Sequence, residues 1–213
     1  MLRTENLHYS YPKGSALSFA DINCAQGEHW LLLGASGSGK TTLLHLLAGL
    51  RKPGSGSIHI HNLDITQLTG AALDHFRGQH IGIIFQQSHF VQALSVRENL
   101  ILAQRFAGLV KDEKKILARL HRLGIADKAD KKPFQLSVGE QQRASICRAL
   151  INGPDVILAD EPTSALDDGN CTAVINLLKE QATQDGATLL IVTHDGRLKT
   201  NFDHQIKLNK LPI

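Results

Sequence analysis

The sequence predicts an α/β fold that has an antiparallel β subdomain at its N-terminus and a helical subdomain inserted into the α/β core. Three observations predict it. The first 30 residues alternate apolar and polar side chains between turn residues, as in a short antiparallel sheet. The apolar segment 30–33 runs into a glycine-rich loop and then into the helical segment 42–50, which is the order that begins an α/β unit. From about residue 88 to residue 150 the strand pattern disappears.

After the first helix, the sequence predicts further strands up to residue 85 and then a helix. Segment 57–65, after the turn at 52–56, has the pattern of a strand pair, and segment 81–85 has that of a buried strand. Within the stretch that lacks a strand pattern, an amphipathic helix ending at Gly124 is predicted by the apolar spacing of Ile116, Leu117, Leu120 and Leu123.

Strands return in the last part of the chain. Segments 156–159 and 188–192 are short and continuously apolar, and the helical segment 172–182 separates them. We therefore predict a single domain over residues 1–213. Its core and β subdomain occupy residues 1–87 and 151–213, and its helical subdomain occupies residues 88–150.

Composition narrows the classes of function. A chain of 213 residues, of which 42% are hydrophobic, can bury a substantial core. The formal net charge is +3 and the basic residues form no run, so no nucleic acid is expected as a partner. The three cysteines form no CxxC pair, which argues against a disulfide framework or a zinc site and fits the reducing cytoplasm. No segment approaches the ~20 apolar residues of a membrane-spanning helix, so another chain must supply any membrane part.

Residues 34–41 read Gly-Ala-Ser-Gly-Ser-Gly-Lys-Thr, which matches the phosphate-binding pattern G-x-x-x-x-G-K-[ST] between a strand and a helix. Glycines let backbone N–H groups and the start of the next helix point at a phosphate. Lys40 is expected to bridge the β- and γ-phosphates of ATP, and Thr41 to bind Mg²⁺. The alternative is a glycine-rich turn without a ligand. The predicted phosphate-binding residues are Gly34, Ala35, Ser36, Gly37, Ser38, Gly39, Lys40, Thr41 and Thr42.

Two adjacent carboxylates follow the apolar segment 156–159, at the strand end where open α/β sheets bind ligands. We expect Asp160 to hold Mg²⁺, through a water, and Glu161 to polarise the attacking water as a general base. Taken alone, the pair could instead cap a helix.

The segment 136–143, Leu-Ser-Val-Gly-Glu-Gln-Gln-Arg, resembles the LSGGQ motif of ABC ATPases. The resemblance implies a P-loop NTPase with a RecA-like core that forms an ATP-dependent homodimer. It also implies that Ser137 and Gly139, with Glu140 beside them, contact the nucleotide bound by the opposite subunit. Val138 stands where the family has its first glycine, and Glu140 where it has glutamine.

Further matches to the family follow in its order along the chain. Gln86 resembles the Q-loop glutamine, which reaches Mg²⁺ and the attacking water, and Ser164–Asp167 resembles the D-loop, which crosses the dimer interface. His194, at the end of what we interpret as the last core strand, resembles the switch histidine that holds the catalytic glutamate. Tyr11 resembles the aromatic residue that stacks on adenine, and Tyr9 is the alternative.

Segments 76–86 and 93–100 are similar to those of the lipoprotein-releasing, macrolide-export and FtsE-like group. The resemblance implies an ATP-hydrolysing subunit that drives integral membrane permease subunits from the cytoplasm, peripherally on the inner face of the cell membrane. An FtsE-like mechanotransmission ATPase and an amino-acid-type importer ATPase are the alternatives. A different P-loop enzyme, such as a small-molecule kinase, would lack segment 136–143.

Overall fold

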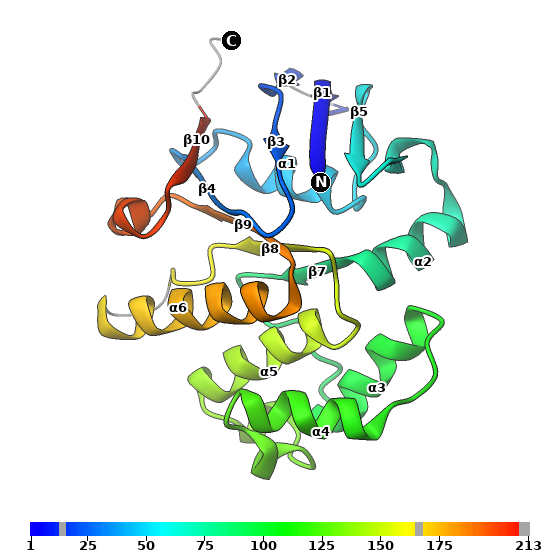
Figure 1. Ribbon diagram of the computed structural model, residues 1–213, viewed down its shortest axis with the longest axis vertical. Helices are drawn as coiled ribbons and strands as arrows, with labels where there is room; N and C mark the ends of the chain where they lie inside the picture. The colour runs from blue at the N-terminus through cyan, green and yellow to red at the C-terminus, as the bar shows by residue number, and fades with distance from the viewer. Residues whose placement is uncertain (13–15, 165–167, 209–213) are drawn as a thin grey trace.

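The computed structural model describes residues 1–12, 16–164 and 168–208. A parallel sheet forms the centre of the molecule, with strand order β10-β4-β9-β8-β7 (Figure 1). Every residue of β8 and β9 is buried, as expected for parallel strands covered on both faces. The strands are β4 (His29–Gly34), β7 (Ile81–Ile84), β8 (Val156–Asp160), β9 (Thr188–Thr193) and β10 (His204–Leu208).

Alternation along these strands divides the core in two. On β9, Leu189 and Ile191 join the cluster that contains α6, whereas Leu190 and Val192 join the cluster that contains α1. Successive side chains of a strand point to opposite faces, so two helices lie on opposite faces of the sheet. These helices are α1 (Lys40–Leu47) and α6 (Asp168–Asp185).

A second sheet is antiparallel and lies beyond α1, at the end of the molecule that contains the N-terminus. Its central strand β1 (Leu2–Ser10) pairs with β2, β3 and β5. Leu2, Leu7 and Ile60 are fully buried against the α1 cluster, so this sheet covers the helix that follows the glycine loop. The other strands are β2 (Ala16–Ser18), β3 (Asn23–Cys24), β5 (Ser55–Ile60) and β6 (Leu63–Asp64).

Helices replace strands between β7 and β8, and they lie together at the opposite end of the molecule in Figure 1. They are α3 (Val96–Phe106), α4 (Glu113–Arg122) and α5 (Val138–Leu150), with 3₁₀ turns at Ala126–Lys128 and Pro133–Gln135. Leu100, Ile116 and Leu150 are fully buried where the helices meet. The mixed α/β fold and the predicted amphipathic helix are confirmed, while the boundaries at residues 88 and 150 stay a prediction.

Two expectations need correction, and one helix was not expected. His194 does not end the last core strand, because β10 follows it and pairs with β4 at the sheet edge; its two exposed leading residues hide the strand pattern. The first helix ends at Leu47 rather than near residue 50, since Gly49 has φ +63°, a left-handed conformation that ends helices. Helix α2 (Gly70–His80), which has no fully buried residue, was not expected. A 3₁₀ turn (Ile65–Gln67) precedes α2, and another (Gly196–Asn201) precedes β10.

The described helices include none that is both long enough and apolar enough to cross a bilayer.

Candidate nucleotide site

The glycine loop connects β4 to α1 and wraps around its own lysine. Gly37 and Gly39 have φ of +76° and +92°, which a side chain would strain. The Lys40 amine donates to the carbonyl oxygens of Gly34, at 2.8 Å, and Ala35, at 3.1 Å. A Cβ on Gly34 would lie 2.4 Å from Ser38 Oγ, so the loop is too tightly folded to admit one. The buried Ser38 hydroxyl has no hydrogen-bond partner among the described residues, and it is available to an anion.

Asp160, the last residue of β8, lies under the start of α1. Its side chain is hydrogen-bonded to Thr41, and burial is the main reason that its pKa is raised above the ordinary aspartate value. Its Oδ1 is buried without a hydrogen-bond partner in the described part of the chain. An orphaned carboxylate oxygen beside a threonine hydroxyl is a hard oxygen donor set, which fits Mg²⁺.

Glu161 is held in an unusual conformation by the end of the neighbouring strand. Its φ is +46°, which strains a residue other than glycine. Thr193 Oγ1 donates to its Oε2 at 2.7 Å, and the backbone N–H of His194 donates to its Oε1 at 3.1 Å. His194 Nδ1 lies 2.7 Å from the same Oε1, and the Lys40 amine lies 3.9 Å from it. The carboxylate is therefore fixed from three sides.

Tyr11, rather than Tyr9, lines the cavity in front of the glycine loop. The two rings meet edge to face with centroids 5.0 Å apart, and the Arg51 guanidinium lies 5.8 Å from the centroid of the Tyr11 ring and donates to the Tyr9 hydroxyl at 2.7 Å. The Tyr11 hydroxyl is hydrogen-bonded to that of Thr42. The aromatic ring is thus fixed beside the loop.

This cavity has a volume of about 500 Å³ and brings together most of the residues expected in the nucleotide site. Around it lie Tyr11, Ser36, Gly37, Gly39, Lys40, Thr41, Thr42, Gln86, Glu161 and His194. Ser137, Gly139 and Glu140 do not line it, and Asp167 lies outside the described residues.

Ser137 is the N-cap of α5 and is exposed, as are Val138 and Gly139. Its hydroxyl accepts from the N–H of Glu140 at 3.3 Å, and the Glu140 carboxylate accepts from the N–H of Ser137 at 2.8 Å. This reciprocal capping box presents the start of α5 to solvent. Val138, 71% exposed, adds an apolar side chain there.

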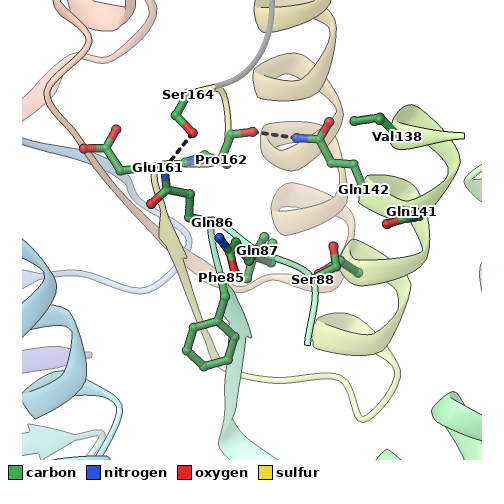
Figure 2. Close-up of a pocket in the computed structure, with 12 residues that line it drawn as sticks. Phe85, Gln86, Gln87, Ser88, Val138, Gln141, Gln142, Glu161, Pro162 and Ser164 are labelled. Carbon is green, nitrogen blue, oxygen red and sulfur yellow. Dashed lines mark hydrogen bonds between the residues drawn. The ribbon is translucent and has the colours of Figure 1, made fainter. Parts of the chain in front are cut away.

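A second cavity, of about 360 Å³, separates the Gln86 segment from α5 (Figure 2). Across it Gln86 Nε2 donates to Ser164 Oγ at 3.2 Å, and Gln142 Nε2 donates to the carbonyl oxygen of Pro162 at 2.5 Å. Both bonds end on the segment that follows Glu161. Gln142 is a residue to which sequence reasoning gave no role, although it lies within segment 136–143; only that position points to it.

Comparison with known proteins gives a consistent set of similarities. Residues 17–164 match the ABC_tran family, described as "ABC transporter". Two relatives carry the name macrolide export ATP-binding/permease protein MacB. The one from Aeromonas hydrophila is 45% identical, over 88% of this chain and 29% of its own length. The one from Escherichia coli O157:H7 is 38% identical, over 98% of this chain and 33% of its own length. The chain therefore spans about a third of these relatives.

Solved structures resemble nearly the whole chain. A dimeric post-hydrolysis state of the ATP-binding cassette MJ0796, bound to ADP and Pi, superposes with a TM-score of 0.87 at 34% identity, over 99% of this chain and 95% of that one. The cassette cbiO1 from Clostridium perfringens, part of the transporter complex cbiONQ, gives a TM-score of 0.87 at 31% identity, over 98% and 84%.

Proposed function

Because this chain belongs to the ABC transporter family and is an ATPase cassette of that family, we propose that two copies close around two MgATP and drive separate membrane permease subunits. Each composite site takes its glycine loop from one copy and the start of α5 from the other. The observation that carries the proposal is the separation of these two parts within one chain. Ser137 and Gly139 are exposed and lie outside the cavity that holds Lys40. The solved MJ0796 cassettes are dimeric.

The chemistry follows from the arrangement around Glu161. On nucleotide binding, the Lys40 amine exchanges the loop carbonyls for the β- and γ-phosphates, because a phosphate is the stronger partner for an ammonium group. Glu161, fixed by Thr193 and His194, accepts a proton from the attacking water as general base. Thr41, Gln86 and, through a water, Asp160 would hold Mg²⁺, which supplies charge neutralisation to the phosphates. Gln86 leaves Ser164 to do so.

The permease subunits are proposed to dock in a groove whose lining includes Phe85, the residue before Gln86. This groove has a volume of about 450 Å³ and runs between α2, β7, α3 and α5, with Phe85, His89, Phe106 and Arg148 in its lining. Phe106 is 72% exposed, and Phe85 precedes Gln86 directly. A partner that displaces Phe85 would therefore also displace Gln86, the next residue, which lines the nucleotide cavity.

The relatives are named as macrolide export ATP-binding/permease proteins, which favours efflux as the transport that this chain drives. Lipoprotein release belongs to the same proposal as efflux, and the alternatives are an FtsE-like mechanical role and amino-acid import. The permease decides between them.

The test is the oligomeric state of Glu161→Gln in size-exclusion chromatography with light scattering. With MgATP this variant retains ATP and is expected to elute as a dimer, and with ADP as a monomer. Lys40→Ala in the same background is the control and is expected to stay monomeric with ATP. A Glu161→Gln variant that binds ATP and remains monomeric overturns the proposal.

A further inference from the structure

A lysine outside segment 136–143 contacts the acidic residue within it. Lys128, the last residue of the 3₁₀ turn Ala126–Lys128, lies with its Nζ 3.3 Å from Glu140 Oε1. The other carboxylate oxygen, Oε2, lies 2.8 Å from the backbone nitrogen of Ser137 and 3.0 Å from its hydroxyl. Glu140 therefore connects Lys128 to Ser137, with one oxygen for each.

The charge of Glu140 creates a difficulty at this place. The start of a helix attracts anions through its free N–H groups and its dipole, and a carboxylate in the first turn offsets that attraction for a second anion. Asp127 adds another carboxylate, 3.0 Å from the same lysine amine. The three charged side chains thus sum to −1, and they would sum to −2 without Lys128.

Glu140 also determines where the Ser137 hydroxyl points. That hydroxyl accepts from the N–H of Glu140 and donates to its carboxylate, so it is held on the helix start by two bonds to a single residue. Hydrogen bonds to Ser137 are the main cause of the lowered pKa of Glu140, with Lys128 contributing. The carboxylate therefore stays ionised at neutral pH, and its charge must be balanced by a neighbour.

We propose that Lys128 is a positioning residue of the composite ATP site: it holds and neutralises the Glu140 carboxylate, so that Ser137 can receive the γ-phosphate bound by the second copy of the chain. The inference rests on the proposed function, because it requires a phosphate from a second copy. Lys128 acts through Glu140 and touches no nucleotide itself.

The test uses the Glu161→Gln background and measures the ATP concentration that gives half-maximal dimer. Lys128→Met is expected to raise this ATP concentration roughly fivefold, because each of the two sites loses one exposed charge pair and such a pair contributes at most about that factor. Lys128→Arg is expected to behave as the parent. Lys131→Met, which removes an exposed lysine three residues away, is the matched control and is expected to change nothing.

The decisive variant is Lys128→Met combined with Glu140→Gln. A glutamine still accepts from the N–H of Ser137 but carries no charge to balance, so the double variant is expected to dimerise within about twofold of Glu140→Gln alone. If Lys128 only packed against the turn, the double variant would be as weak as Lys128→Met, and that result overturns the inference. Thermal unfolding of the monomers confirms that each variant is folded.

Two further readouts separate this inference from the proposed function. Binding of ATP to the monomer is expected to be unchanged in Lys128→Met, because the Lys40 loop is intact. In otherwise wild-type protein the same substitution raises KM for ATP and leaves kcat unaltered at saturation. A parent that never dimerises overturns both proposals, whereas a parent that dimerises equally well with Lys128→Met overturns this inference alone.

Discussion

Glu161 and His194, which lie 33 residues apart in the sequence, meet with Oε1 and Nδ1 2.7 Å apart. Adjacent parallel strands bring them together, because β8 ends at Asp160 and β9 ends at Thr193. Glu161 is nearly buried, with 11% of its side chain exposed, whereas His194 is 62% exposed. The histidine therefore covers the carboxylate from the cavity side.

His194→Ala is expected to lower kcat of ATP hydrolysis by about a hundredfold, because Glu161 loses a contact that positions it and a positioned general base contributes at least about that factor. ATP binding should persist, since Lys40 is untouched. Thr193→Val removes one of the other bonds to Glu161 and should lower kcat by about tenfold. The measurement is steady-state phosphate release, and His204→Ala, a histidine at the sheet edge, is the control. Equal rates in His194→Ala and wild type would show that the contact has no catalytic consequence.

Tyr11 is expected to bind the adenine ring of ATP. Tyr11→Ala should raise KM for ATP by roughly tenfold, because loss of a stacked aromatic ring removes about 1–3 kcal/mol per base. Tyr11→Phe keeps the ring and loses the bond to Thr42, so its KM should stay close to that of the wild type. Tyr9→Phe, outside the cavity, is the matched control. The assignment is wrong if Tyr11→Ala and Tyr11→Phe give the same KM.

Asp160 is expected to destabilise the nucleotide-free protein. Burial raises its pKa above the ordinary value of 3.8, so the proton is bound more tightly in the folded chain than in the unfolded one. The stability that protonated Asp160 contributes is fully present below pH 3.8. It is lost as pH rises through the pKa of Asp160 in the folded protein. Asp160→Asn should therefore raise Tm at pH 7 while abolishing hydrolysis.

Calorimetry of both proteins between pH 7 and about pH 4 checks the sign. The difference in Tm between Asp160→Asn and wild type should shrink as pH falls, because protonation removes the charge from the wild-type residue. A difference that grows toward low pH would contradict the argument.

The sequence predicts the elements that depend on local patterns, but it does not predict those that depend on distant contacts. The glycine loop, Glu161 and Ser137 each sit in a short pattern at a strand end or helix start, and the structure has these elements there. The position of β10 depends on pairing with β4, in which His204 lies opposite Trp30, 174 residues earlier. The exposed residues of β10 do not reveal this pairing. The contact between Lys128 and Glu140 likewise joins a 3₁₀ turn to the start of α5.

Arg119 and Asp185 form a buried ion pair that joins α4 to α6. Arg119 Nη2 lies 2.8 Å from Asp185 Oδ2, and their side chains are 7% and 13% exposed. Arg119 also donates to Gln181 Oε1 and to the carbonyl oxygen of Leu150. Removal of one partner leaves an unpaired buried charge, so Asp185→Asn should lower the free energy of unfolding by about 3 kcal/mol. Urea unfolding at pH 7 measures it.

Arg122→Met is the matched control for this pair. Its Nη1 lies 3.5 Å from Asp185 Oδ1, but its side chain is 46% exposed, and an exposed pair contributes at most about 1 kcal/mol. Removal of both charges by Arg119→Met with Asp185→Asn should restore much of the lost stability, because no unpaired charge remains buried. If the double variant is less stable than either single variant, the effect comes from the lost bonds to Gln181 and Leu150 rather than from charge.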